Sequence, residues 1–161
     1  TGYKALAFHA VNSDFPIFDD IQNYVVDRGK AAGAGDQIGT VLYNRGMYNA
    51  MLITEAAKTA QAITGKSNIS QLDMVKGFEA LEMTEEKMAA LGLAGFGPSF
   101  KVSCENHGGD GMVAVAQWDA GAGKWSIVSD YQASDMSVLQ PLIDADSGAF
   151  ASENNISPNC D

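Results

Sequence analysis

The sequence predicts a mixed α/β fold, and three observations support this. A short run rich in apolar residues, Tyr3 to Val11, has the length of a buried strand. Apolar residues then recur at three- and four-residue steps in several segments, which is typical of amphipathic helices. Beyond Phe100, glycine-rich turns separate short strand-like runs. The strands are too few for a complete doubly wound sheet.

The first half of the chain is expected to be mainly helical. Pro16 suits a first helical turn, and the apolar periodicity continues to Arg28. Ile38 to Tyr43 is expected to be extended. Met47 to Ile63 is the strongest helical segment, and its apolar positions surround the helix almost completely, so we expect it to be well buried.

Two further helices have clear start signals. Ser70-Gln71-Leu72-Asp73 resembles a capping box with Asp in place of Glu, and it opens a helix to about Leu81. Thr84 caps a second, shorter helix that ends at Gly92.

The last part of the chain is expected to form strands, then a helix. Met112 to Trp118 and Lys124 to Val128 flank a glycine-rich turn, which predicts a hairpin. Phe100 to Cys104 is a shorter strand-like run. A final helix is predicted from about Ser134 to Ala151, and Pro141 should bend or delay it.

Composition restricts the class of protein. The 161 residues are 46% hydrophobic and 19% charged, and no apolar run reaches the roughly 18 to 20 residues of a membrane helix. The net charge is −10 and the basic residues form no stripe, so we expect no nucleic-acid partner. The chain opens at Thr1 with neither an initiator Met nor a signal peptide, so we expect a processed or truncated N-terminus.

Motifs for catalysis, metals and cofactors are not found. The sequence contains no phosphate-binding loop and no dinucleotide-binding fingerprint, and we expect no cofactor. Cys104 and His107 have C-x-x-H spacing, and Asp110 could add a third ligand, but a polar turn explains them better. A nucleophilic Cys104 is disfavoured because Glu105 and Asp110 surround it with negative charge. We therefore expect neither an enzyme nor a metal site. Counting alone leaves open whether Cys104 and Cys160 form a disulfide or remain thiols.

An ordered set of segments resembles the periplasmic solute-binding proteins of the branched-chain amino-acid type. No single motif in the set is sharp, and the order carries the resemblance. The segments are Ile38 to Ala50, Lys76 to Leu81, Gly97 to Cys104, His107-Gly108-Gly109, Gln117-Trp118, Lys124 to Tyr131 and Ile156 to Cys160.

The resemblance implies a type I periplasmic-binding-protein fold, with two Rossmann-like lobes joined by three crossings. Two such lobes need roughly twice this length, so the fold would be incomplete in this chain. The expected parts are four. They are a strand and the second crossing (1–12), a helical part of the N-terminal lobe (13–96), the third crossing with closing strands (97–131), and a C-terminal helix and tail (132–161).

The function implied is that of an extracytoplasmic substrate-binding subunit of an ABC importer, with its signal peptide removed. Such a subunit captures a small amino acid or a related carboxylate or amide, aromatic ones included, between its lobes. It delivers this solute to a membrane permease. The missing N-terminal portion of the same protein would be a further partner. The alternative is a ligand-sensing receptor domain of a regulator with the same fold. A disulfide between Cys104 and Cys160 is also implied.

Four residues are candidates for ligand binding. Ligands of open α/β sheets bind beyond the carboxyl ends of strands. Tyr43 and Asn44 lie at such a point, followed by Arg45, which could steer an anion. His9 ends the first strand near a predicted crossing. The competing interpretations are that Tyr43 packs in the core, Asn44 caps the helix, Arg45 is solvated and His9 is a hydrogen-bonded hinge residue.

Overall fold

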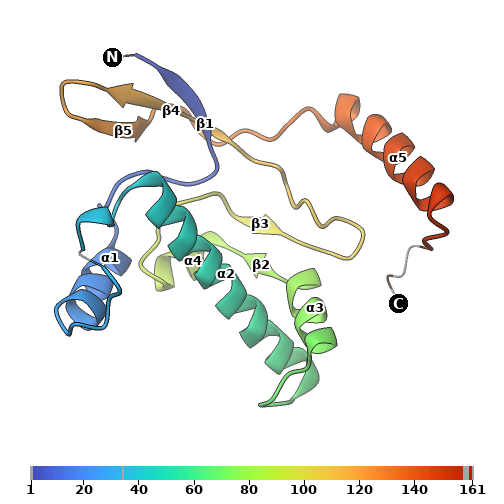
Figure 1. The fold of residues 1–161 in the computed structure, drawn as a ribbon. Helices are drawn as coiled ribbons and strands as arrows, with labels where there is room; N and C mark the ends of the chain where they lie inside the picture. Colours follow the sequence, from blue (N-terminus) through green and yellow to red (C-terminus); the bar gives the residue numbers. More distant parts are fainter. Residues whose placement is uncertain (1, 34, 158–159, 161) are drawn as a thin grey trace.

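A computed structural model describes residues 2–33, 35–157 and 160 of the chain. Its main sheet has three antiparallel strands in the order β1-β4-β5 (Figure 1). Ala5 of β1 lies opposite Ala116 of β4, and Trp118 of β4 lies opposite Trp125 of β5. The strands are β1 (Lys4–Ala7), β4 (Ala114–Asp119) and β5 (Lys124–Ile127). The predicted mixed α/β class and the predicted β4–β5 hairpin are confirmed.

The rest of the structure is mostly helical. The second sheet has only two short antiparallel strands, β2 (Glu82–Met83) and β3 (Phe100–Lys101). A π-helical stretch, Gln22–Val26, continues the first helix. The α-helices are α1 (Pro16–Ile21), α2 (Val41–Thr64), α3 (Gln71–Glu79), α4 (Glu85–Ala90) and α5 (Met136–Glu153).

Helix α2 departs from the sequence prediction at its start. The segment from Ile38 to Tyr43 was expected to be extended, but α2 begins at Val41. Thr40 is the N-cap, because its side-chain oxygen accepts the backbone N–H of Tyr43 at 3.4 Å. The prediction was wrong because β-branched and aromatic residues favour strands only as a weak preference, which one capping bond reverses here.

The burial of α2 was also predicted wrongly. Its buried residues are Asn44, Tyr48, Ala56 and Ala60, and Tyr43, Met47, Met51 and Leu52 pack partly buried against the core. Large apolar side chains elsewhere on α2 remain exposed, namely Leu42, Ile53 and Ile63. An apolar helix is therefore buried here only where the fold supplies a partner.

Helices α3 and α4 start as predicted. Ser70 caps α3, and its side chain accepts the Asp73 N–H at 3.2 Å while the Asp73 carboxylate accepts the Ser70 N–H at 2.9 Å. Lys66 donates to the same carboxylate at 2.9 Å. Thr84 caps α4 by accepting the Lys87 N–H. These local hydrogen bonds fix the directions in which the two helices leave their loops.

The core lies among α1, α2, β2, α4 and the segment that follows α4, and α3 packs against it through Met74. Its largest fully buried side chains include Phe96, Met83, Met88 and Leu93. Helices α2 and α3 approach closely at Gly77, where an added Cβ would meet the Ala56 carbonyl oxygen. Just beyond α3, the Leu81 carbonyl oxygen accepts the Val102 N–H at 2.9 Å, which brings the end of α3 close to the loop that carries Cys104.

The C-terminal helix α5 lies apart from the rest of the molecule (Figure 1). It contains Pro141 and has no buried residue. Cys160, beyond its end, forms a disulfide with Cys104. Residues 158–159 and 161 of the expected polar tail lie outside the described residues. Within the described part of the chain, no helix is long and apolar enough to span a membrane.

Candidate functional site

Asn44 ties the start of α2 to the segment that follows β1. Its side chain is 0% exposed, and its Nδ2 donates to the carbonyl oxygens of Ala10 at 3.2 Å and Asn12 at 2.9 Å. Its Oδ1 is buried and has no hydrogen-bond partner among the described residues. Asn44 therefore acts as a buried connector between two segments. It is not the helix cap, because Thr40 caps α2.

His9 is the second buried polar residue at this point. It is 3% exposed, and its Nδ1 lies 2.8 Å from the Ala10 carbonyl oxygen. Because a carbonyl only accepts, Nδ1 carries the proton and Nε2 is the acceptor. Nε2 is buried and has no hydrogen-bond partner in the described chain. Burial lowers the His9 pKa, the bond to Ala10 opposes this in part, and the Arg45 charge lowers it further. The imidazole is thus neutral near pH 7.

A small cavity of about 140 Å³ adjoins His9. Its walls are mainly apolar and come from β1, the start of α2 and the hairpin. The lining residues include Phe8, His9, Val41, Arg45, Ala116 and Trp125. Chemically, the cavity combines an apolar surface with the neutral imidazole of His9 and the guanidinium group of Arg45. Arg45 is exposed to solvent. This set suits a small, partly apolar group that carries a hydrogen-bond donor for His9 Nε2 and an acceptor or a negative charge for the Arg45 guanidinium.

Tyr43 does not share this cavity. It is half-buried and packs against the hydrophobic core, with its ring centroid 6.5 Å from that of Phe18. Tyr43 and Arg45 are two positions apart on a helix, so their side chains point about 200° apart. The structure therefore groups His9, Asn44 and Arg45, and it directs Tyr43 to the core.

Two aromatic residues that sequence reasoning missed complete the surroundings of His9. The Phe96 ring stacks on the imidazole, with centroids 5.4 Å apart and planes inclined by 4°. The Tyr48 ring lies 6.1 Å from it, and burial raises the Tyr48 pKa to about 12. Tyr48 follows Asn44 by four residues, so helical spacing could have found it. For Phe96, distant in sequence, there was no such signal.

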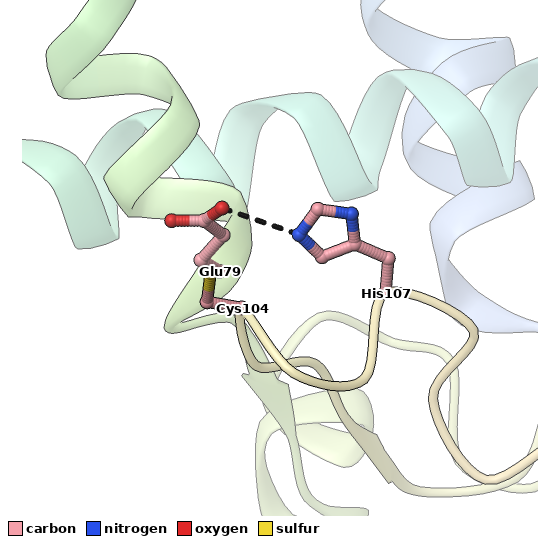
Figure 2. A group of neighbouring side chains, drawn as sticks. All are labelled: Glu79, Cys104 and His107. Atoms are coloured by element: carbon pink, nitrogen blue, oxygen red, sulfur yellow. Dashed lines mark hydrogen bonds and ion pairs between the residues drawn. The ribbon is translucent and has the colours of Figure 1, made fainter. Parts of the chain in front are cut away.

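A second cluster lies at the end of α3 and contains Glu79, Cys104 and His107 (Figure 2). His107 Nε2 lies 3.2 Å from Glu79 Oε1, and one potential ligand atom of each residue falls within 4.8 Å of the others. Asp110, the third ligand considered from sequence, is not part of this group. Glu79 takes its place, and no local spacing indicated it.

This cluster does not fit a metal. The Cys104 sulfur is bonded to the Cys160 sulfur, so it supplies no thiolate. One imidazole and one carboxylate remain, whereas a structural zinc site needs four ligands and a catalytic one needs three. The disulfide also removes the nucleophile of a Cys104–His107 pair. His107 and Glu79 are best described as a partly exposed hydrogen-bonded pair beside a disulfide.

Comparison with known proteins gives one informative similarity. No protein-family model and no curated protein matches this sequence. The chain is similar to a solved structure described as an ABC transporter permease from the Pseudomonas fluorescens group. The two share 33% identity with a TM-score of 0.88, and the match covers 98% of this chain. It covers only 38% of that one, so this chain spans well under half of its neighbour's length.

This similarity corrects the prediction made from the ordered segments. A permease and a solute-binding protein are different components of an ABC transporter, so the substrate-binding assignment is wrong. The expected partnership with a separate permease is corrected as well, because the permease is what this chain resembles. The segments misled because helix caps, glycine turns and Ala-rich helices are shared by many α/β proteins. The likeness of this chain is to a permease.

Proposed function

We propose that this chain is a portion of a component of an ABC transporter. One observation carries the proposal, namely the neighbour described as an ABC transporter permease. The chain follows its fold over 98% of its own length at a TM-score of 0.88 and 33% identity. Fold alone does not determine function. Here sequence identity accompanies the fold along nearly the whole chain, which supports a shared component class.

We propose an extracytoplasmic position for this portion. The Cys104–Cys160 disulfide supports it, since disulfides form and persist in oxidising compartments and are rare in the cytosol. The net charge of −10 is in accord with a surface that does not bind nucleic acid. We further propose that the rest of the protein completes a two-lobed α/β architecture of the type I periplasmic-binding kind, meant here as a fold and not as a function.

We propose no catalysis by this portion. The cavity beside His9 is the place where we expect it to meet a transported solute. His9 Nε2 supports this, because it is a buried acceptor with no partner in the described chain. Arg45 lines the same cavity and would attract a negatively charged group. Asn44 holds the two wall segments together.

The test uses the full-length protein in its native host. A deletion strain is compared with its parent by profiling which small molecules are taken up or exported in an energy-dependent way. We expect the deletion to change the movement of at least one compound and the wild-type gene to restore it. Cross-linking in intact cells should connect the protein to an ATP-binding subunit carrying a phosphate-binding loop.

A matched pair of arginine variants tests the cavity. Arg45→Gln should reduce the restored transport, whereas Arg28→Gln should not, because Arg28 contacts the Tyr24 ring away from the cavity. An unchanged transport profile in the deletion strain, together with no cross-link to an ATP-binding subunit, would contradict the transporter assignment.

A further inference from the structure

Helix α5 exposes an unusual amount of apolar surface. It is 18 residues long and has no buried residue. Its large apolar side chains are between 39% and 61% exposed, and they are Met136, Val138, Leu139, Leu142, Ile143 and Phe150. Scattered surface apolar residues are ordinary, but several large ones on one helix mark a contact surface.

These side chains gather on one side of α5. At 3.6 residues per turn, Leu139, Ile143 and Phe150 form one stripe. Val138 and Leu142 form a second stripe next to it, which Asp146 continues one turn further on. The opposite side is polar and includes Gln140, whose side chain donates to Asp144 at 2.7 Å. An amphipathic helix of this kind is typical of an element that packs against a partner.

The sequence of α5 cannot make a stable helix without such a partner. Pro141 and Gly148 both lie inside it, and these are the two poorest helix-forming residue types. Most of the stability of protein helices comes from packing of an amphipathic face. The described residues bury none of α5, so the packing must come from elsewhere.

Both ends of α5 are attached to the body of the molecule. Before the helix, Gln132 and Val113 exchange backbone hydrogen bonds of 2.8 and 2.9 Å. After it, Cys160 is bonded to Cys104. These two attachments limit where α5 can move, which favours a partner held at a fixed position over one met by diffusion.

We infer that α5 docks, through the side bearing Leu139, Leu142, Ile143 and Phe150, on the part of the same polypeptide that lies outside this sequence. The inference rests on the proposal that this chain is a portion of a larger component. The solved neighbour supports it, since more than half of that chain lies outside the match. A membrane surface fits less well, because α5 carries acidic residues and no Lys or Arg to attract anionic lipids.

Hydrogen exchange measured by mass spectrometry on the full-length native protein tests the docking. We expect the amides of α5 to exchange at least about tenfold more slowly than those of an unpacked helix, at every protein concentration. Substitution Leu142→Asp should remove this protection and lower the Tm by about 4 °C or more. Ser137→Asp adds the same charge on the opposite side of the helix, about 140° from Leu142 and 120° from Ile143, and should do neither.

Four results would overturn the inference. The first is rapid exchange of α5 in the full-length protein. The second is protection that appears only at concentrations where the protein dimerises, which would make a second copy the partner. The third is protection that appears only with vesicles of anionic lipid. The fourth is an intact native mass close to 17.0 kDa, which leaves no further chain to dock on. If α5 is protected but the protein neither affects transport nor cross-links to an ATP-binding subunit, the docking inference stands and only the proposed function is contradicted.

Discussion

The imidazole of His9 lies parallel to the ring of Phe96, with centroids 5.4 Å apart. This contact joins the end of β1 to the segment that follows α4. It also places a titratable group in the core, because His9 is 3% exposed. A charged imidazole at this position would lose hydration, which explains why burial lowers the His9 pKa.

Stability should therefore depend on pH through His9. With the folded pKa below the unfolded value of about 6.5, the unfolded chain binds more protons as pH falls below that value. The contribution of neutral His9 is complete above about pH 6.5 and is lost as pH falls toward the lowered pKa. The free energy of unfolding in urea should differ less between pH 7.5 and pH 5.0 for His9→Phe than for the wild type. Asn49→Ala, on the exposed side of α2, changes no titratable group, so it serves as the control and should keep the wild-type difference.

Loss of the Asn44 side chain should destabilise the protein. Asn44→Ala removes two buried hydrogen bonds, to the carbonyl oxygens of Ala10 and Asn12. We expect a loss of about 2 kcal/mol in the free energy of unfolding. Asn44→Asp should cost more, since it places a carboxylate oxygen opposite two carbonyl oxygens. Asn49→Ala, on the exposed side of α2, should change stability by no more than about 0.5 kcal/mol. Equal effects at positions 44 and 49 would contradict the connector role.

Two glycine-to-alanine changes should act in opposite directions. At Gly77 the new Cβ would meet the Ala56 carbonyl oxygen and lie 2.8 Å from the Ala60 Cβ. We expect Gly77→Ala to destabilise by about 1 to 3 kcal/mol through overpacking of α2 against α3. Gly46 lies within α2 and has no atom within 4 Å of such a Cβ. Gly46→Ala should stabilise by about 0.5 to 1 kcal/mol. Denaturant unfolding of both variants measures the change in the free energy of unfolding. If both variants are destabilised, close packing at Gly77 is not the cause of the loss of stability.

The disulfide should contribute strongly to stability. Cys104 and Cys160 are 56 positions apart, and closing a loop of that length stabilises by about 4 kcal/mol in the chain-entropy model. The double variant Cys104→Ser, Cys160→Ser should unfold at a correspondingly lower urea concentration. Mass spectrometry without reductant should find no free thiol at Cys104 or Cys160 in the native protein. Two free thiols in protein isolated from its own compartment would contradict both the disulfide and the extracytoplasmic position.

Local chemistry made part of this structure predictable. The capping bonds of Ser70 and Thr84 involve residues within three positions, so the sequence contains all the information they need. The hairpin between β4 and β5 depends likewise on a short glycine-rich turn. These elements were predicted correctly because no distant residue competes with the local signal.

Long-range packing was not predictable in the same way. The apolar residues of α2 did not show which side would meet the core, because that depends on where α3 lies. Phe96 and Glu79 reach their partners His9 and His107 only through the fold. Helical geometry could have separated Tyr43 from Arg45, but only once the start of α2 was known. The functional assignment failed for a similar reason, since short ordered segments do not distinguish components built from similar elements.

The bond between Cys104 and Cys160 closes the intervening residues into a covalent ring. The ring contains β4, β5 and α5, whereas β1 stays outside it and is connected to β4 by ladder hydrogen bonds. A protease that cuts once in the turn between β4 and β5 would open the ring without releasing a fragment. The cleaved chain would gain the mass of one water and separate into two pieces only after reduction.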